Sequence, residues 1–184
     1  MPPQQILLIR HGEKPPPDGH TRGIKEDGTE DHHSLVVRGW QRAGALVPFF
    51  FESRHPELRR PTAVYSPPVR GKVADHGRPH QTVTPIAARI GVEVQCRHGV
   101  DDELELADDV RSCTGVVLIS WEHKRIPKIA NAFLGDSTTA PQTWPDDRFD
   151  LVWVLDLEPS GGYRFSQVPQ LLLAGDRADV APHA

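Results

Sequence analysis

Short apolar segments alternate along this chain with segments in which apolar residues recur every three or four positions, and this alternation restricts the possible folds more than any other feature. A strand is followed by a helix four times over, and Ser34 is the expected cap of the first helix. This order predicts an α/β fold, a three-layer sandwich with a mostly parallel sheet and helices on both faces. The expected strands are 5–10, 62–65, 92–97 and 116–120, and the expected helices are 37–51, 78–90, 104–110 and 126–134.

The last part of the chain departs from this alternation. Segments 150–157 and 163–167 flank the turn sequence Pro-Ser-Gly-Gly at 159–162, which predicts an antiparallel edge hairpin. The chain has 184 residues, which lies within the roughly 100–200 residues common for one domain. We therefore expect a single domain over 1–184.

Composition excludes several classes of protein. The chain has 21 Lys and Arg residues against 25 Asp and Glu, a net charge of −4, so its bulk charge offers no attraction to nucleic acid or to an anionic membrane. No apolar run approaches the roughly 18 residues of a membrane span, and the start lacks the basic and apolar regions of a secretory signal. We therefore expect a cytoplasmic protein with no nucleic-acid or membrane partner.

Two histidines and two arginines lie at the ends of the expected elements. Arg10 and His11 end the first strand, His123 follows the strand at 116–120, and Arg78 begins a helix. Parallel strands end at one edge of a sheet, and ligands bind beyond that edge, so these side chains are expected to converge there. The result is a cationic pocket in a protein of negative net charge.

Phosphate is the ligand that such a pocket favours. Guanidinium groups bind phosphoryl oxygens in pairs and stay charged at any relevant pH. A neutral imidazole can attack phosphorus, and water can then hydrolyse the phosphohistidine. Because the arginines neutralise the charge of the transferring group, we expect the reaction to need no metal ion or cofactor.

A metal site is the alternative use of the histidines. His20, His32 and His33 lie in the polar segment 13–34. Zinc sites need a rigid scaffold with fixed ligand spacing, which a loop rich in Gly, Asp and Glu does not supply. The prediction is therefore that no metal binds.

Several motifs resemble those of the histidine phosphatase superfamily, also called phosphoglycerate-mutase-like proteins, and the resemblance spans nearly the whole chain. The first is Arg-His-Gly-Glu at 10–13, and the second is a helix motif with Leu, Gly, Gln and Ala at 35–43. The third is Ser-Pro-x-x-Arg at 66–70 followed, after an insertion, by Arg-x-x-Gln-Thr at 78–82. The last is the late strand with its second histidine at 118–123.

The resemblance implies roles for these residues. His11 is the expected nucleophile, Arg10 and a second arginine hold the phosphoryl group, and His123 stabilises it. The second arginine is either Arg70 or Arg78. We favour Arg78 because Gln-Thr and a helix follow it, and Arg70 stays a candidate for substrate binding.

The proton donor for the leaving group is the least defined part of this site. It should be a carboxyl group with a raised pKa at the pocket. Glu122 stands next to His123 and is the first candidate. The alternatives are the loop acids Asp101, Asp102 and Glu103, although an acidic run is usually a solvated face.

The function that these observations favour is hydrolysis of phosphomonoesters by a metal-independent phosphatase. Phosphoryl transfer as in a phosphoglycerate mutase is one alternative, but the mutases of this family are longer. A non-catalytic phosphate-binding module is another, and its sign would be substitution of Arg10 or of either histidine; all three are present. The expected partner is a small phosphorylated substrate, whose identity the sequence does not reveal.

Overall fold

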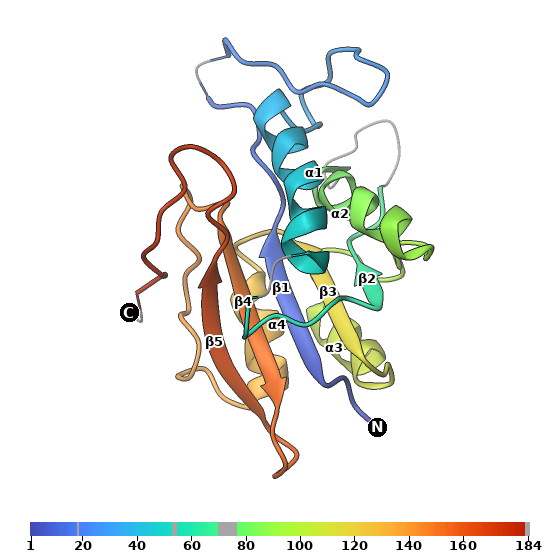
Figure 1. Ribbon diagram of the computed structural model, residues 1–184, viewed down its shortest axis with the longest axis vertical. Helices are drawn as coiled ribbons and strands as arrows, with labels where there is room; N and C mark the ends of the chain where they lie inside the picture. The colour runs from blue at the N-terminus through green and yellow to red at the C-terminus, as the bar shows by residue number, and fades with distance from the viewer. Residues whose placement is uncertain (18, 53–54, 70–76, 183–184) are drawn as a thin grey trace.

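A computed structural model describes residues 1–17, 19–52, 55–69 and 77–182 of the chain. Within these residues one sheet of five strands runs in the order β2-β3-β1-β4-β5 (Figure 1). Four helices accompany the sheet. The strands are β1 (Gln5–Arg10), β2 (Ala63–Tyr65), β3 (Val116–Trp121), β4 (Leu151–Leu157) and β5 (Tyr163–Pro169), and the helices are α1 (Val37–Phe51), α2 (Gly77–Ile90), α3 (Glu103–Arg111) and α4 (Ile126–Leu134).

The sheet is parallel on one side and antiparallel on the other. β1 pairs with β3, and β3 with β2, in parallel, whereas β4 pairs with β1 and with β5 in antiparallel fashion. In the β1–β3 register Arg10 lies opposite Trp121, so the residues after both strands reach the same edge. The predicted α/β architecture with its antiparallel edge hairpin is confirmed.

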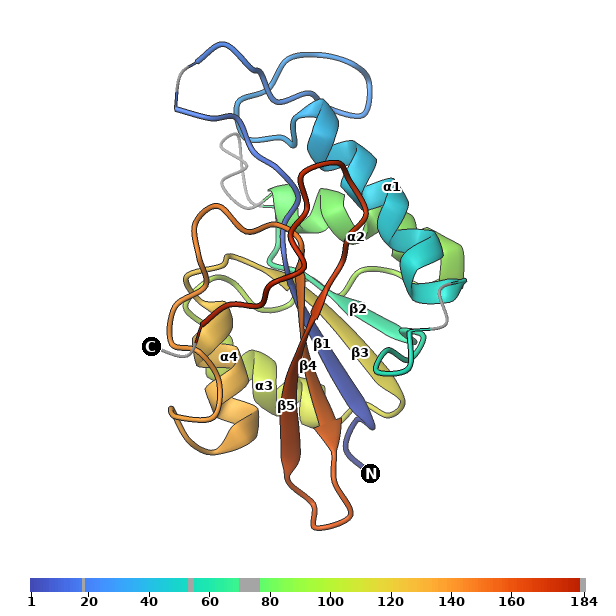
Figure 2. The same cartoon turned by 60° about the vertical axis from the view of Figure 1, so that its left-hand side comes forward.

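Helices cover both faces of the sheet. Figure 2 shows α1 and α2 on one side of it and α3 and α4 on the other. The side chains of β1 alternate between the two resulting cores, because successive residues of a strand point to opposite faces. Leu7 and Ile9 pack with α1 and α2, and Ile6 and Leu8 pack with α3 and α4.

Two sequence predictions about local structure are wrong. Segment 92–97, predicted as a strand, forms only one parallel bridge, between Gln95 and Tyr65, because β2 beside it is itself only three residues long. Ser34 does not cap α1, whose N-cap is Val36. The Ser34 hydroxyl instead donates to Asp31 and accepts a hydrogen bond from Gln81, which ties the loop before α1 to α2.

Candidate active site

The carboxyl ends of β1 and β3 bring the predicted residues together at one edge of the sheet, beneath the long loop that connects β1 to α1 (Figure 1). Arg10 is 1% exposed, and His11 and His123 are each 5% exposed. Arg78 lies at the start of α2, and its charge acts on both Arg10 and His11. The structure therefore places the two histidines and two arginines in one site.

His11 is held in the tautomer that a nucleophile requires. Its Nδ1 lies 2.6 Å from the carbonyl oxygen of Gly12. A carbonyl only accepts, so Nδ1 carries the proton and Nε2 keeps its lone pair. Burial, and then the charge of Arg10, lowers the pKa of His11 well below its ordinary value. The imidazole is therefore neutral and can attack an electrophile through Nε2.

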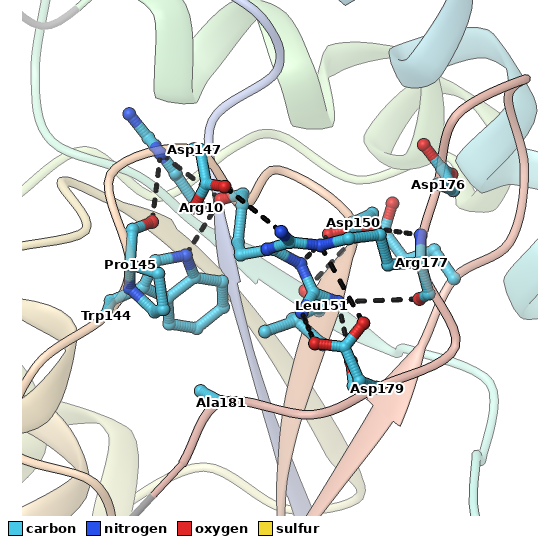
Figure 3. Close-up of polar contacts among 12 residues, drawn as sticks. Arg10, Trp144, Pro145, Asp147, Asp150, Leu151, Asp176, Arg177, Asp179 and Ala181 are labelled. Atoms are coloured by element: carbon cyan, nitrogen blue, oxygen red, sulfur yellow. Dashed lines mark hydrogen bonds and ion pairs between the residues drawn. The ribbon is translucent and has the colours of Figure 1, made fainter. Parts of the chain in front are cut away.

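Arg10 uses one side of its guanidinium to bind the protein. Its Nη1 donates to the carbonyl oxygens of Asp146, at 2.5 Å, and Arg148, at 3.2 Å, and the group stacks on Phe149, with 3.8 Å from its central carbon to the ring centroid. Figure 3 shows this arginine against the segment before β4. Nε and Nη2 are buried without a hydrogen-bond partner among the described residues. These two N–H groups are suited to an oxyanion.

The charge of Arg10 is preserved despite its burial. Burial lowers the pKa of its guanidinium to about 10, while the carboxylates of Asp146, Asp147 and Glu13 act in the opposite direction. A pKa of about 10 still leaves the group protonated at neutral pH. The site therefore presents a permanent positive charge to a ligand.

The segment before β4 is held in place by the last part of the chain. Arg148 is buried and donates to Asp150 at 2.6 Å and to both the carboxylate and the carbonyl of Asp179. The indole of Trp144 donates to the carbonyl of Arg148. This carbonyl is also one of those that bind Arg10, so residues 144–150 form a fixed support for that arginine.

The start of α2 is fastened to the loop that carries His11. The hydroxyl of Thr82 accepts from the backbone N–H of Gly12 at 2.8 Å and donates to the carbonyl of Arg78 at 2.7 Å. The side chain of Gln81 accepts from the backbone N–H of Leu35. The Gln-Thr pair of the third motif thus fixes Arg78 relative to His11.

The two glycines of the first two motifs allow α1 to approach the same loop. A Cβ on Gly12 would lie 2.9 Å from the carbonyl oxygen of Gly39, and a Cβ on Gly39 would lie 2.6 Å from the carbonyl oxygen of Glu13. The carboxylate of Glu13 receives hydrogen bonds from the buried Arg42, which also binds Asp176 at 2.7 Å. Glu13 therefore joins α1 and the C-terminal segment to the loop that carries His11.

His123 has two ring nitrogens in different surroundings. Nε2 donates to Oδ1 of Asp146 at 2.6 Å, whereas Nδ1 is buried without a partner in the described part of the chain. Burial and the charge of Arg10 lower the pKa of His123, and Asp146 opposes this effect. Sequence reasoning missed Asp146. The available signal was topological, because a strand antiparallel to β1 begins at the edge where β1 ends.

The predicted acids lie in different environments. Glu122 is half-buried, its backbone carbonyl receives the first hydrogen bonds of α4, and its carboxyl group forms no hydrogen bond or ion pair with the described residues. Asp101 pairs with Arg125, and Asp102 accepts from the backbone N–H of Gly99. Arg70, the alternative second arginine, lies outside the described residues.

Glu103 does not meet the expectation for a general acid. It is fully buried, and its carboxylate accepts from Lys128 at 2.9 Å and from the indole of Trp121 at 3.3 Å. Burial alone would raise its pKa, but hydrogen bonds from the backbone of Asp101 and from Lys128 and Trp121 lower it. The carboxylate is ionised and occupied in linking α3 to β3 and α4.

A cleft of 380 Å³ is lined by Lys124, Pro127, Gln142, Thr143, Trp144 and Asp146, the last of which is bound to His123. Lys14 adds a further cation to the site, and burial, followed by the charges of Arg10 and Arg78, lowers its pKa.

In 1–17, 19–52, 55–69 and 77–182 no group of three His, Cys, Asp or Glu side chains is arranged to hold a metal ion. None of the helices found there has the length and apolar character to span a membrane.

Comparison with known proteins identifies the fold. No protein-family model matches the sequence, and no curated protein matches it. Among solved structures, the protein histidine phosphatase SixA complexed with tungstate is 15% identical, with a TM-score of 0.52 over 90% of this chain and 97% of that one. A mycobacterial glucosyl-3-phosphoglycerate phosphatase complexed with VO3 is 12% identical, with a TM-score of 0.50 over 89% and 97%.

A third structure, phosphoglycerate mutase from Plasmodium falciparum, is 10% identical, with a TM-score of 0.53 over 96% of this chain and 97% of that one. The chain thus has an α/β fold shared by two phosphatases and a mutase. This is the fold that the resemblance of the motifs at 10–13 and 78–82 implied.

Proposed function

We propose that this chain hydrolyses phosphomonoesters through a phosphohistidine formed on His11, without a metal ion. The observation that carries the proposal is the hydrogen bond from Nδ1 of His11 to the carbonyl of Gly12. It leaves Nε2 unprotonated in a buried site beside Arg10 and Arg78. A nucleophile next to fixed cations is suited to phosphoryl transfer, in which electrostatic stabilisation is the main contribution of the protein.

The reaction proceeds in two steps at this site. Nε and Nη2 of Arg10 bind phosphoryl oxygens, and Arg78 contributes a second guanidinium from α2. Nε2 of His11 attacks phosphorus, the bond from phosphorus to the leaving oxygen breaks, and a phosphohistidine forms. Water then attacks phosphorus, the N–P bond breaks, and phosphate leaves. His11 returns to its starting tautomer because Gly12 holds the Nδ1 proton throughout.

The leaving group extends into the cleft that Asp146, the partner of His123, helps to line. Lys124 and Asp146 lie on its walls, and Gln142 and Thr143 offer further hydrogen-bonding groups. These polar side chains suit a hydroxylated or charged leaving group, and Pro127 and Trp144 add an apolar surface to the cleft. The cleft therefore supports a polar small molecule as substrate.

The decisive experiment traps the intermediate. Purified protein is mixed with 32P-labelled phosphomonoester, quenched in acid or alkali, and analysed for protein-bound label; the expected label is acid-labile, alkali-stable and mapped to His11. His11→Ala should lose both label and release of phosphate, while His55→Ala, a histidine in the loop after α1, should keep both. EDTA should leave the rate unchanged, and vanadate should inhibit as an analogue of the pentacoordinate transition state.

The same experiment separates the alternatives. Release of inorganic phosphate at the rate of substrate loss indicates hydrolysis, whereas label passed to a second phosphate acceptor indicates a mutase. Binding of phosphate or vanadate without label on His11 indicates a phosphate-binding module. Label on Ser or Asp, or activity that EDTA abolishes and zinc or magnesium restores, would contradict the proposal.

A further inference from the structure

The pairing of His123 with Asp146 is not explained by phosphate binding alone. His123 is 5% exposed, and its Nε2 is committed to Oδ1 of Asp146 at 2.6 Å. The other nitrogen, Nδ1, is buried without a partner among the residues described. Asp146 comes from the segment that also binds Arg10, so one stretch of chain fixes both side chains.

The proposal drawn from this geometry rests on the phosphatase function proposed above. We propose that Asp146 is a positioning residue that holds His123 with Nε2 turned to the carboxylate and Nδ1 turned to the phosphoryl site, and that His123 is the proton donor to the leaving group. His123 is then a catalytic residue, and Asp146 acts through it.

The charges around His123 show why it needs a carboxylate. Arg10 from β1, Lys14 from the following loop and the buried surroundings all disfavour the imidazolium. His11 is the other titratable group that faces it, and it is neutral. Asp146 is the carboxylate that opposes these effects and raises the pKa of His123. A bound phosphomonoester dianion adds negative charge and raises it further, so the proton is present when substrate is bound.

The proton balance closes over the two steps. In the first, His11 forms the N–P bond, the P–O bond of the ester breaks, and the leaving oxygen takes the proton from Nδ1 of His123. In the second, neutral His123 accepts a proton from the attacking water through Nδ1, and the N–P bond breaks. Throughout both steps Asp146 stays ionised, and Nε2 of His123 keeps its proton in the hydrogen bond to Asp146. The sum is ester plus water giving alcohol plus phosphate.

The carboxyl groups nearby are poorer donors. Asp146 itself is 84% exposed at its side chain, and the hydrogen bond from His123 lowers its pKa, so it carries no proton to give at neutral pH. Glu103 is ionised and bound to Lys128. Among the residues that the structure describes, the carboxyl group of Glu122 makes no hydrogen bond or ion pair that would fix its orientation.

The first test uses the leaving group. Nitrophenolate leaves without protonation, whereas an alkoxide requires a proton in the transition state. Asp146→Asn should slow hydrolysis of glycerol 2-phosphate by about 100-fold or more and that of nitrophenyl phosphate by less than about tenfold. Asp108→Asn is the matched control, because this surface carboxylate of α3 pairs with Arg111 and its side chain is 77% exposed; both substrates should change by less than about threefold.

The second test uses pH. Donation requires protonated His123, so kcat for glycerol 2-phosphate should fall as pH rises through the pKa of His123 in the complex. Asp146 raises this pKa, so Asp146→Asn should move the alkaline fall to lower pH, and Asp108→Asn should not. NMR titration of the His123 imidazole in protein saturated with inorganic phosphate should show the same lowering.

The outcomes separate this inference from the function on which it rests. If the wild-type protein forms no phosphohistidine, the proposed function fails, and the NMR titration still decides whether Asp146 controls His123. If the protein is active but Asp146→Asn behaves like Asp108→Asn in rate and titration, the inference is wrong. It is also wrong if Glu122→Gln, and not Asp146→Asn, selectively slows glycerol 2-phosphate.

Discussion

The guanidinium of Arg10 binds the protein with one of its nitrogens and leaves the other two for the phosphoryl group of the proposed substrate. One amino group binds backbone carbonyls of residues 145–148, while Nε and Nη2 are buried and unpaired among the described residues. Only an arginine can supply both arrangements at once, because lysine has a single nitrogen and no planar fork. The residue therefore contributes shape as well as charge.

Arg10→Lys should accordingly lower kcat for nitrophenyl phosphate by about 100-fold or more, the loss typical of removing a donor to a developing oxyanion. Steady-state kinetics with vanadate inhibition as a second readout checks this, and vanadate affinity should fall in parallel. Arg59→Lys, an exposed arginine before β2, is the control and should leave both unchanged. Retention of more than a tenth of wild-type kcat in Arg10→Lys would contradict a paired role for Nε and Nη2.

At the scale of secondary-structure elements, helix α1 lies directly against residues 12–13 of the loop that carries His11. Gly39 lies within α1, and an added Cβ would meet the carbonyl of Glu13 at 2.6 Å. Gly44 lies in the same helix with nothing within 4 Å of such a Cβ. In a helix interior, alanine is more stable than glycine by about 0.5–1 kcal/mol, so the two positions should respond in opposite directions.

Gly44→Ala should raise the melting temperature by about 1–4 °C, and Gly39→Ala should lower it, because α1 must move away from residues 12–13. The displaced loop carries the Gly12 carbonyl that fixes the tautomer of His11, so Gly39→Ala should also lower kcat. Thermal unfolding followed by circular dichroism, with phosphatase assays on both variants, checks this. A stabilised, fully active Gly39→Ala would show that the close approach has no role.

Element order was predictable from the sequence, and so were the residues at the strand ends. The alternation of β1, α1 and β3 follows from local periodicity, and Arg10, His11 and His123 follow from where parallel strands end. Two local errors have one cause. The strand expected at 92–97 and the cap expected at Ser34 depend on which neighbour each segment meets, and periodicity carries no information about neighbours.

The part of the site that the sequence did not predict also depends on neighbours distant in the chain. Asp146 and the carbonyls that bind Arg10 lie in an irregular segment whose only sequence signal is a pair of acids, the usual sign of a solvated loop. Glu103 belongs to an acidic run of the kind that usually forms a solvated face, and yet it is fully buried and accepts a hydrogen bond from Lys128. Which acid of a run turns inward is decided by partners distant in the sequence.

At the scale of the whole molecule, buried ion pairs join the two ends of the chain. Asp176, in the C-terminal segment, binds Arg42 of α1, which binds Glu13 after β1. Burial alone would raise the pKa of Asp176, but hydrogen bonds from Arg42 and from the backbone of Leu173 and Leu172 lower it to about 2. The carboxylate thus stabilises the fold in its ionised form.

This stabilisation should depend on pH in one direction. Because the folded pKa is below the ordinary value of 3.8, the contribution is fully present above that value and is lost as pH falls through about 2. Asp176→Asn should therefore reduce the free energy of unfolding by about 2 kcal/mol at pH 7, with a difference from wild type that shrinks between pH 4 and pH 2. Urea unfolding across this range measures it.

Asp108→Asn serves as the control, because Asp108 pairs with Arg111 at the surface and is 77% exposed, so the loss should be under about 1 kcal/mol. A deficit in Asp176→Asn that stays constant down to pH 2 would contradict the role of its charge.

The hydrogen bond from Arg10 to the carbonyl of Arg148 spans 138 residues of sequence, and this separation orders events during synthesis. At about 5–20 residues per second, a ribosome makes Arg10 and the loop that carries His11 roughly 7–28 s before it makes the carbonyls that orient Arg10. A nascent chain can build β1, α1, β2 and β3 in that interval, but Arg10 and His123 both still lack their partners from 145–148. Under the proposed function, catalytic competence is therefore acquired late, when β4 joins β1, so activity on stalled ribosomes of graded chain length would report the closing step of folding.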